Sequence, residues 1–306
     1  MRIRVLTAIL AVALGSSILP ASAAGQKLTL DEVIAKHLAS IGTPEVRAAA
    51  KTRVAEGTLK YEILSGGAGT MEGKAVLVSQ GNNIREVLRF NRSDYRGEDL
   101  LTDSSRIQIF KGLILSGRST PDRSLLGEFL YNEPSVLRDG IFGGAIATSW
   151  PLLSAKYRDA KLTYNGLKKV DGRELHEVQY VPKKKGDVQI RLYFDQDFRH
   201  VMTVATVEIH PSLLSGGSDG LAGNFMGRDD PQTGGVDTAN ARQQPIRFRM
   251  EQTFSGFRQV DGLTLPSECG IKFSAEGYRS QVANYTVHFD TIENNVPLDP
   301  KNFAMK

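Results

Sequence analysis

Most of the chain alternates between apolar and polar residues, which is the period of a β-strand with one buried face. The segment around Gln108, with Ile107 and Ile109 on either side, shows the pattern in its shortest form. Strands are expected at residues 54–64, 73–79, 83–90, 106–110, 160–164, 173–181, 187–194, 201–209, 246–257, 263–273 and 282–289. Tight turns, among them Asp171-Gly172 and Asp261-Gly262, separate several of these segments. The sequence therefore predicts about ten or eleven antiparallel strands in meander order.

A helix is predicted ahead of these strands. Thr29 and Glu32 form a capping box, in which each side chain accepts a hydrogen bond from the backbone N–H of the other residue. Five apolar residues follow at helical spacing: Leu30, Val33, Ile34, Leu38 and Ile41. Gly42 ends the helix, and Pro44 opens a second short helical segment. A short amphipathic helix of this kind needs a broad apolar surface to pack against.

Residues 122–157 break the strand pattern and predict one or two helices with an apolar loop. Because an amphipathic helix and a sheet with one apolar face need each other for burial, these elements belong together. We therefore expect a single α+β domain over residues 24–306.

Residues 211–245 differ from the rest in composition, with seven glycines among many Ser, Asp, Asn and Gln residues. A loop of this length is uncommon inside a compact domain. Two interpretations are open: a disordered connection, or a lid that closes over a ligand. The lid interpretation rests on apolar residues that linkers seldom carry: Leu213, Leu214, Leu221, Phe225 and Met226.

The N-terminus has the three parts of a secretory signal peptide. Arg2 and Arg4 are positively charged, residues 5–14 are apolar, and residues 21–23 form an A-x-A site. The apolar run is too short for a membrane-spanning helix, which needs about 20 residues. We expect cleavage between Ala23 and Ala24, with residues 1–23 removed; the alternative is a buried N-terminal helix of the mature fold. With no cysteine near the cleavage point, the mature protein is expected to be released rather than lipid-anchored.

Composition adds little to this picture. Removal of Arg2 and Arg4 reduces the formal net charge from +4 to about +2, too small a basic excess to indicate nucleic-acid binding. No second apolar segment approaches membrane-spanning length. The single cysteine, Cys269, lies in an apolar strand and is expected to be buried rather than reactive.

Candidate chemistry is sparse, and no metal or cofactor site is expected. The best metal candidate is Asp195, Asp197 and His200, but they lie at a predicted hairpin turn, where aspartates serve the backbone. A metal-dependent or hydrolytic enzyme at this point is the weakest functional alternative. A basic stretch that includes Arg85, Arg89, Arg92 and Arg96 is either a solvated strand edge or a contact for acidic headgroups. Nothing in the sequence nominates a nucleophile and a base.

Four segments resemble the LolA-like outer-membrane lipoprotein carriers. They read LTLDEVIAKHLASIGTPEVRAAAKTRVAEGTL, VDGRELHEVQYVPKK with VQIRLYFDQDFRHV, FRQVDGLTLPSECGIKF, and VPLDPKNFAMK. The resemblance implies a LolA/LppX-like incomplete (half) β-barrel, a curved antiparallel sheet wrapped around helices with an apolar cavity between. This chain is longer than typical carriers, chiefly through residues 211–245 and the region after residue 106.

Carriers of this family hold acyl chains in the cavity, without catalysis or cofactor, in the periplasm. The resemblance thus implies a monomer that binds a lipid or the acyl chains of a lipoprotein, with an envelope protein as a further partner. The signal peptide alone does not distinguish the periplasm from the exterior. The alternative is a structural or interaction module of the cell envelope with a filled core. The cavity candidates, chosen for their chemistry, are Phe110, Leu113, Ile114, Leu126, Phe129, Phe142, Ile146 and Trp150.

Overall fold

The computed structural model describes most of the expected mature chain. The described residues are 28–67, 69–93, 95–103, 105–110, 124–153, 159–184, 186–209, 245–276 and 281–305. The predicted signal peptide with Ala23 and Ala24, and the 211–245 segment except Pro245, lie outside them. Two cavity candidates, Leu113 and Ile114, lie outside them as well.

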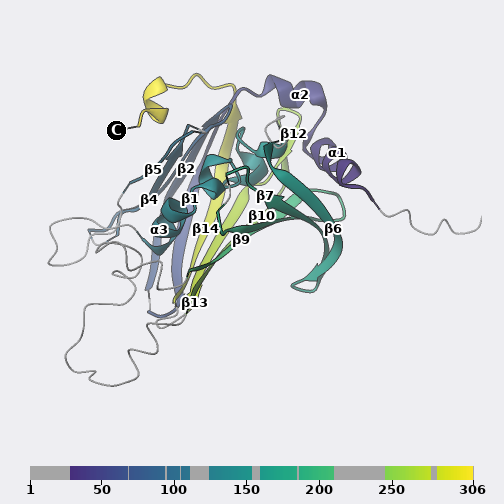
Figure 1. The fold of residues 1–306 in the computed structure, drawn as a ribbon. Helices are drawn as coiled ribbons and strands as arrows, with labels where there is room; N and C mark the ends of the chain where they lie inside the picture. Colours follow the sequence, from purple (N-terminus) through teal and green to yellow (C-terminus); the bar gives the residue numbers. More distant parts are fainter. Residues whose placement is uncertain are drawn as a thin grey trace, which may run out of the picture.

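One large antiparallel sheet dominates the fold (Figure 1). Its twelve strands follow the order β5-β4-β3-β2-β1-β14-β13-β10-β9-β8-β7-β6, and the first and last do not pair, so the sheet is open. The strands are β1 (Thr52–Ser65), β2 (Gly69–Gln80), β3 (Asn83–Phe90), β4 (Gly97–Thr102), β5 (Ile107–Ile109), β6 (Lys161–Val170), β7 (Arg173–Val181), β8 (Gln189–Phe194), β9 (His200–Ile209), β10 (Ile246–Ser255), β13 (Glu268–Glu276) and β14 (Gln281–Asn294). This confirms the α+β class and the half-barrel architecture.

The strand count differs from the prediction in three places. Strand β4 and the short β11 (Arg258–Val260) were not expected, and the expected strand at 263–273 is two strands, β12 (Leu263–Leu265) and β13. Strand β12 leaves the large sheet and pairs with β11 as a small hairpin. Pro266, which has no backbone N–H, stands at the break.

The two predicted Asp-Gly turns are confirmed. Asp171 and Gly172 have φ of 48° and 79°, and Asp261 and Gly262 have φ of 50° and 79°. Two successive positive φ angles are the geometry of a two-residue hairpin loop whose twist matches that of the strands.

The first helix also forms as predicted. Helix α1 (Leu30–Ile41) carries the Thr29–Glu32 capping box and ends at Gly42. Helix α2 (Pro44–Ala49) follows, with Thr43 as its N-cap. Helix α1 contacts β6, the last strand of the large sheet, and β12 of the small hairpin.

The helical segment between β5 and β6 fills the concave face of the sheet. It comprises α3 (Leu125–Asn132), α4 (Ser135–Arg138) and two short 3₁₀ helices, η1 (Gly144–Ile146) and η2 (Pro151–Leu153). Figure 1 shows the sheet curving around this segment, which contacts β4 and β5 through α4 and α3 and reaches β9 through η1. The segment therefore joins the two halves of the curved sheet.

On the opposite side, the C-terminal helix η4 (Pro300–Phe303) packs against β3. The Arg85 guanidinium anchors it by donating to the Asn302 carbonyl at 3.4 Å. In the part of the chain that the structure describes, no helix is both long and apolar enough to cross a membrane.

Candidate functional site

Five of the predicted cavity residues meet on the concave face. Leu126 and Phe129 come from α3, and Phe142, Ile146 and Trp150 come from the segment after α4. Each is at most 2% exposed, and all five belong to one core cluster. Their packing against the sheet is direct, because the Phe129 ring lies 5.7 Å from the ring of Phe273 on β13.

Phe110 is placed apart from the other five. It follows β5 directly and is partly buried. The Arg85 guanidinium lies 5.8 Å from the centre of its ring. Arg85 alternates with Ile84 and Glu86, which face the core, so Phe110 lies toward the convex side.

Hydrogen bonds attach the segment after α4 to the sheet. Arg53 on β1 donates to the Ile146 carbonyl at 2.7 Å, and the Thr148 N–H donates to Ser79 Oγ on β2 at 3.0 Å. Gly144 allows the backbone to come close: its φ is +54°, and a Cβ there would lie 2.5 Å from the Phe254 ring. The segment is thus fixed by its own backbone groups as well as by apolar packing.

A third attachment runs through two buried histidines. His37 on α1 donates from Nδ1 to the Phe198 carbonyl at 2.9 Å and accepts at Nε2 from the Trp150 indole N–H at 3.0 Å. The ring of His200 stacks on Trp150, with 4.4 Å between ring centres. Burial lowers the pKa of His37 to about 4 and places that of His200 well below its ordinary value. Both imidazoles are therefore neutral near pH 7 and link α1 to the sheet and the helical segment.

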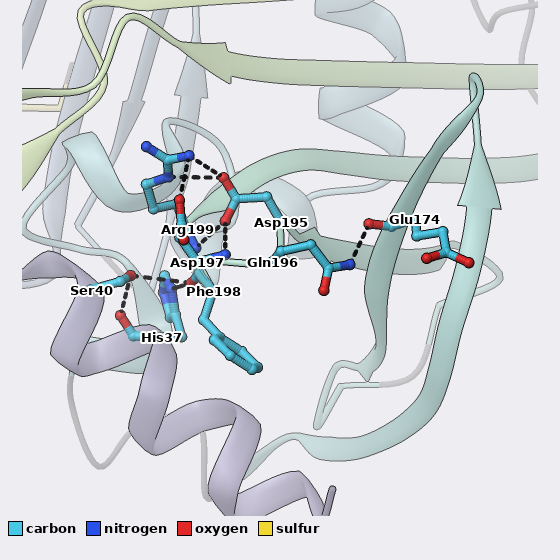
Figure 2. Close-up of polar contacts among 8 residues, drawn as sticks. All are labelled: His37, Ser40, Glu174, Asp195, Gln196, Asp197, Phe198 and Arg199. Carbon is cyan, nitrogen blue, oxygen red and sulfur yellow. Dashed lines mark hydrogen bonds and ion pairs between the residues drawn. The ribbon is translucent and has the colours of Figure 1, made fainter. Parts of the chain in front are cut away.

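The three side chains of the predicted metal candidate, at the β8–β9 turn, make other contacts. Asp195 accepts backbone N–H donors from Asp197 and Arg199, at 3.0 and 2.8 Å, and its carboxylate pairs with the Arg199 guanidinium at 2.7 Å (Figure 2). Asp197 pairs with the same guanidinium at 3.0 Å. His200 instead turns into the core, where Thr203 Oγ lies 2.9 Å from its Nε2. Among the described residues, no group of three or more His, Cys, Asp or Glu could hold a metal ion.

The β8–β9 turn also anchors α1 through hydrogen bonds to one of its carbonyl groups. Figure 2 shows Ser40 and His37 on α1 pointing at the Phe198 carbonyl, which lies 3.1 Å from Ser40 Oγ. On the other side of the turn, Gln196 Nε2 donates to the Glu174 carbonyl on β7 at 2.9 Å. The Asp-rich turn therefore acts as a structural joint between α1, β7 and β9.

Six buried side-chain polar atoms have no hydrogen-bond partner among the described residues, and three of them belong to strands of the large sheet. Glu86 on β3 is 2% exposed, and its Oε2 has no hydrogen-bond partner among the described residues. The same holds for Oε1 of Gln252 on β10 and for Nδ1 of His200, both in side chains that are at most 1% exposed. Leaving a buried polar atom unpaired costs roughly 1–3 kcal/mol, so these atoms call for an explanation.

Glu86 and Cys269 are two further titratable groups of this interior, beside the histidines. Burial raises the pKa of Glu86 to about 8, so its carboxyl is mostly protonated at neutral pH. Cys269 is buried as expected, and burial, together with the Glu86 carboxyl nearby, raises the pKa of its thiol. Its sulfur accepts a long bond from Gln252 Nε2 at 3.5 Å, so its partner is an amide rather than a base.

A second polar cluster closes one end of the concave face. Glu98 on β4 accepts from the Tyr95 hydroxyl and, at 3.2 Å, from the Tyr285 hydroxyl, while the two hydroxyls lie 2.7 Å apart. Burial raises the pKa of Glu98. Tyr61 and Phe90 complete the aromatic layer, with the Tyr61 ring 4.8 Å from that of Tyr285.

The sequence did not single out Glu86, Gln252 or Glu98. A signal for Glu86 exists, because Ile84, Glu86 and Leu88 share one phase of the β3 alternation, which places a carboxyl among core positions. The histidine pairing carried no local signal, since His37 and Trp150 are 113 residues apart.

No protein-family model and no curated protein sequence matches this chain. Similar solved structures include a LolA superfamily protein from Nitrosomonas europaea, at 11% identity and a TM-score of 0.42 over 91% of this chain and 98% of the other. A putative outer membrane lipoprotein-sorting protein domain from Vibrio parahaemolyticus has 10% identity and a TM-score of 0.41, over 89% of this chain and 94% of the other. A DUF1329 family protein from Desulfovibrio piger has 11% identity and a TM-score of 0.42, over 90% of this chain and 96% of the other. These identities and TM-scores are too low to assign a family or a function to this chain.

Proposed function

We propose that this protein is a periplasmic carrier that holds a lipid, or the acyl chains of a lipid-modified protein, against the concave face of its sheet and performs no chemistry on it. The observation that carries the proposal is an apolar concave face in which Glu86, Gln252 and His200 each keep one buried atom unpaired. An amphiphilic ligand offers apolar chains for the walls and a polar group for such atoms.

The concave face has the apolar character that an acyl chain requires. Phe129, Trp150 and Phe273 are at most 2% exposed and belong to one continuous apolar cluster. Each methylene of a ligand buried there gains about 0.8 kcal/mol, less the cost of displacing the helical segment that fills this face. The open sheet edges at β5 and β6 leave the concave side without a closing strand pair.

The buried titratable groups are compatible with an apolar ligand. The pKa of His37 is lowered to about 4 and that of Glu86 raised to about 8, both by burial, so each group is mainly uncharged near neutral pH. An uncharged interior does not oppose the burial of an acyl chain. The predicted signal peptide supports the proposed compartment, and N-terminal sequencing of the exported protein should begin at Ala24.

The test is to purify the exported protein from a double-membraned bacterium under native conditions and to analyse it by native mass spectrometry. We expect protein with bound acyl species. A photoreactive fatty acid should then crosslink to peptides of the concave face, above all those that contain Phe129, Trp150 and Phe273.

Crosslinks confined to the exposed apolar side chains Leu64, Tyr131 and Leu167 would indicate unspecific surface contact and would contradict the proposal. Protein without bound lipid, and without displacement of a fluorescent acyl probe, would favour the second candidate. That candidate is a structural or interaction module of the envelope, and the full burial of Leu126, Phe142 and the other three clustered residues is the observation in its favour.

A further inference from the structure

A basic cleft lies at the end of the sheet where β3 turns into β4. Its volume is about 840 Å³, and the residues that line it are Glu72, Gly73, Lys74, Arg89, Phe90, Asn91, Arg92, Ser93 and Arg96. These side chains carry four positive charges against one carboxylate. Asp94, in the same connection, is not among the described residues. The lining as described is therefore strongly cationic.

The strand register brings two of these cations together. Lys74 on β2 lies directly opposite Arg89 on β3, and both side chains are exposed. Like charges directly opposite each other in an antiparallel pair are destabilising. The neighbours across the adjoining strands are uncharged, with Thr58 opposite Lys74 and Gly97 opposite Arg89. The sheet thus contains a repulsive pair at this point, and no acidic residue lies directly opposite either member in the adjoining strands.

Some surface cations of the sheet are paired: Arg85 with Asp99 at 2.8 Å, Arg249 with Glu251 at 2.7 Å and Lys60 with Glu62 at 2.7 Å. The side chains of Lys74, Arg89 and Arg96 form no ion pair or hydrogen bond with another residue that the structure describes. The same holds for Lys168, Lys169 and Arg173 on the β6–β7 hairpin, but only the first three gather in one cleft. Their charges are therefore available to an external anion.

The cleft adjoins the end of the concave face. Phe90 lines the cleft, and its ring also lies 5.9 Å from Tyr61 and 5.4 Å from Tyr95, in the aromatic layer around Glu98. A group bound in the cleft and a chain lying along the concave face would thus be separated by one aromatic ring.

We propose that this cleft binds the phosphate groups of anionic phospholipids, and that the protein docks on a membrane surface through it. Guanidinium groups bind phosphate oxygens through paired N–H donors. A cleft that contains several cations therefore suits a phosphate group better than it suits a weakly binding anion. The inference goes beyond the proposed function, because it concerns another surface and holds whether or not the interior takes a lipid.

The test compares two triple variants of the whole mature protein in co-sedimentation with vesicles. The first is Lys74→Gln, Arg89→Gln and Arg96→Gln in the cleft. The matched control, Lys168→Gln, Lys169→Gln and Arg173→Gln, removes the same charge from exposed positions on the β6–β7 hairpin. All substituted side chains are exposed, and far-UV circular dichroism verifies that both variants fold.

The wild-type protein should bind vesicles of phosphatidylglycerol with phosphatidylcholine and should not bind phosphatidylcholine alone. The cleft variant should bind the anionic vesicles roughly 100-fold more weakly, while the hairpin variant loses only a small part of that affinity. Equal losses in both variants would show a response to net charge and would overturn the assignment.

Two further outcomes are decisive. Unchanged binding by the cleft variant would overturn the proposal. Binding of inorganic phosphate to the cleft with no binding to anionic vesicles would assign the site to a free phosphate and refute membrane docking. Native mass spectrometry of the cleft variant keeps the two proposals distinct, because it should retain any acyl species that the wild-type interior holds.

Discussion

Glu86 gives the protein a pH dependence of stability that one substitution should remove. The side chain is 2% exposed, and burial raises its pKa from 4.5 to about 8. In the unfolded chain the carboxyl ionises near its ordinary pKa. Between these two values the folded state keeps a proton that the unfolded state has released. The free energy of unfolding therefore falls as the pH rises through this window.

The size of the effect follows from the two pKa values. Each pKa unit corresponds to about 1.4 kcal/mol. Integration over the titration shows how much the free energy of unfolding falls below that of a protein whose carboxyl stays protonated in both states: by about 1 kcal/mol at about pH 5 and by about 4 kcal/mol at about pH 8. Because Glu86→Gln replaces the carboxyl by a neutral amide of the same shape, the variant escapes this cost. Its stability relative to the wild type should rise by roughly 3 kcal/mol between those pH values.

Urea unfolding followed by circular dichroism, at several pH values between about 5 and 8, measures the difference. Other groups, His37 among them, titrate alike in both proteins, so their contributions cancel. Glu56→Gln on β1, at an exposed position, is the control and should keep a constant difference from the wild type. A constant difference for Glu86→Gln as well would show that Glu86 is ionised in the folded protein and would refute the reasoning.

Three other substitutions or reagents test the interior. Trp150→Phe should destabilise the protein by about 2–4 kcal/mol in urea unfolding, because it removes volume and leaves His37 Nε2 without its donor; an effect below 1 kcal/mol would contradict the hydrogen bond. Gly144→Ala should cost about 2–5 kcal/mol, since it combines a positive φ with a clash, whereas Gly172→Ala, with the same kind of φ and open space, should cost only about 1–2 kcal/mol. The Cys269 thiol should resist a thiol reagent in the folded protein and react on unfolding; rapid stoichiometric labelling of the native state would disprove its burial.

Local sequence patterns were sufficient to predict a strand where that strand has one buried face. Strand β3 has the predicted bounds, because it alternates and ends at turn residues. Strand β7 also has its predicted bounds, although residues 175–178 are all buried, because turn residues stand at both of its ends. Strand β4 was missed because Leu100 and Leu101 are both fully buried, on opposite faces. A strand buried on both sides loses the alternation by which strands are recognised.

The sequence could predict only the part of the candidate site that does not depend on contacts between residues far apart in the chain. The apolar residues between α3 and η2 were predicted to line a ligand cavity; five of them belong to one core cluster in the described structure, and their contact with a ligand stays a prediction. The polar part could not be predicted in the same way, since Glu98 meets a tyrosine 187 residues away and His37 meets a carbonyl 161 residues away. Such pairs depend on the curvature of the whole sheet rather than on any local pattern.

Among the residues that the structure describes, the edge strands β5 and β6 each have one side without a neighbour in the sheet, and this has a consequence for self-association. Exposed strand edges can template polymerisation between copies of a chain. Here β5 has only three residues, and β6 carries exposed Lys161, Lys168 and Lys169 together with a bulge between Tyr164 and Leu167. A short edge gives an incoming strand little to pair with, while lysines and a bulge repel and misalign it. The chain can therefore keep its sheet open in a crowded compartment without joining edge to edge into fibres.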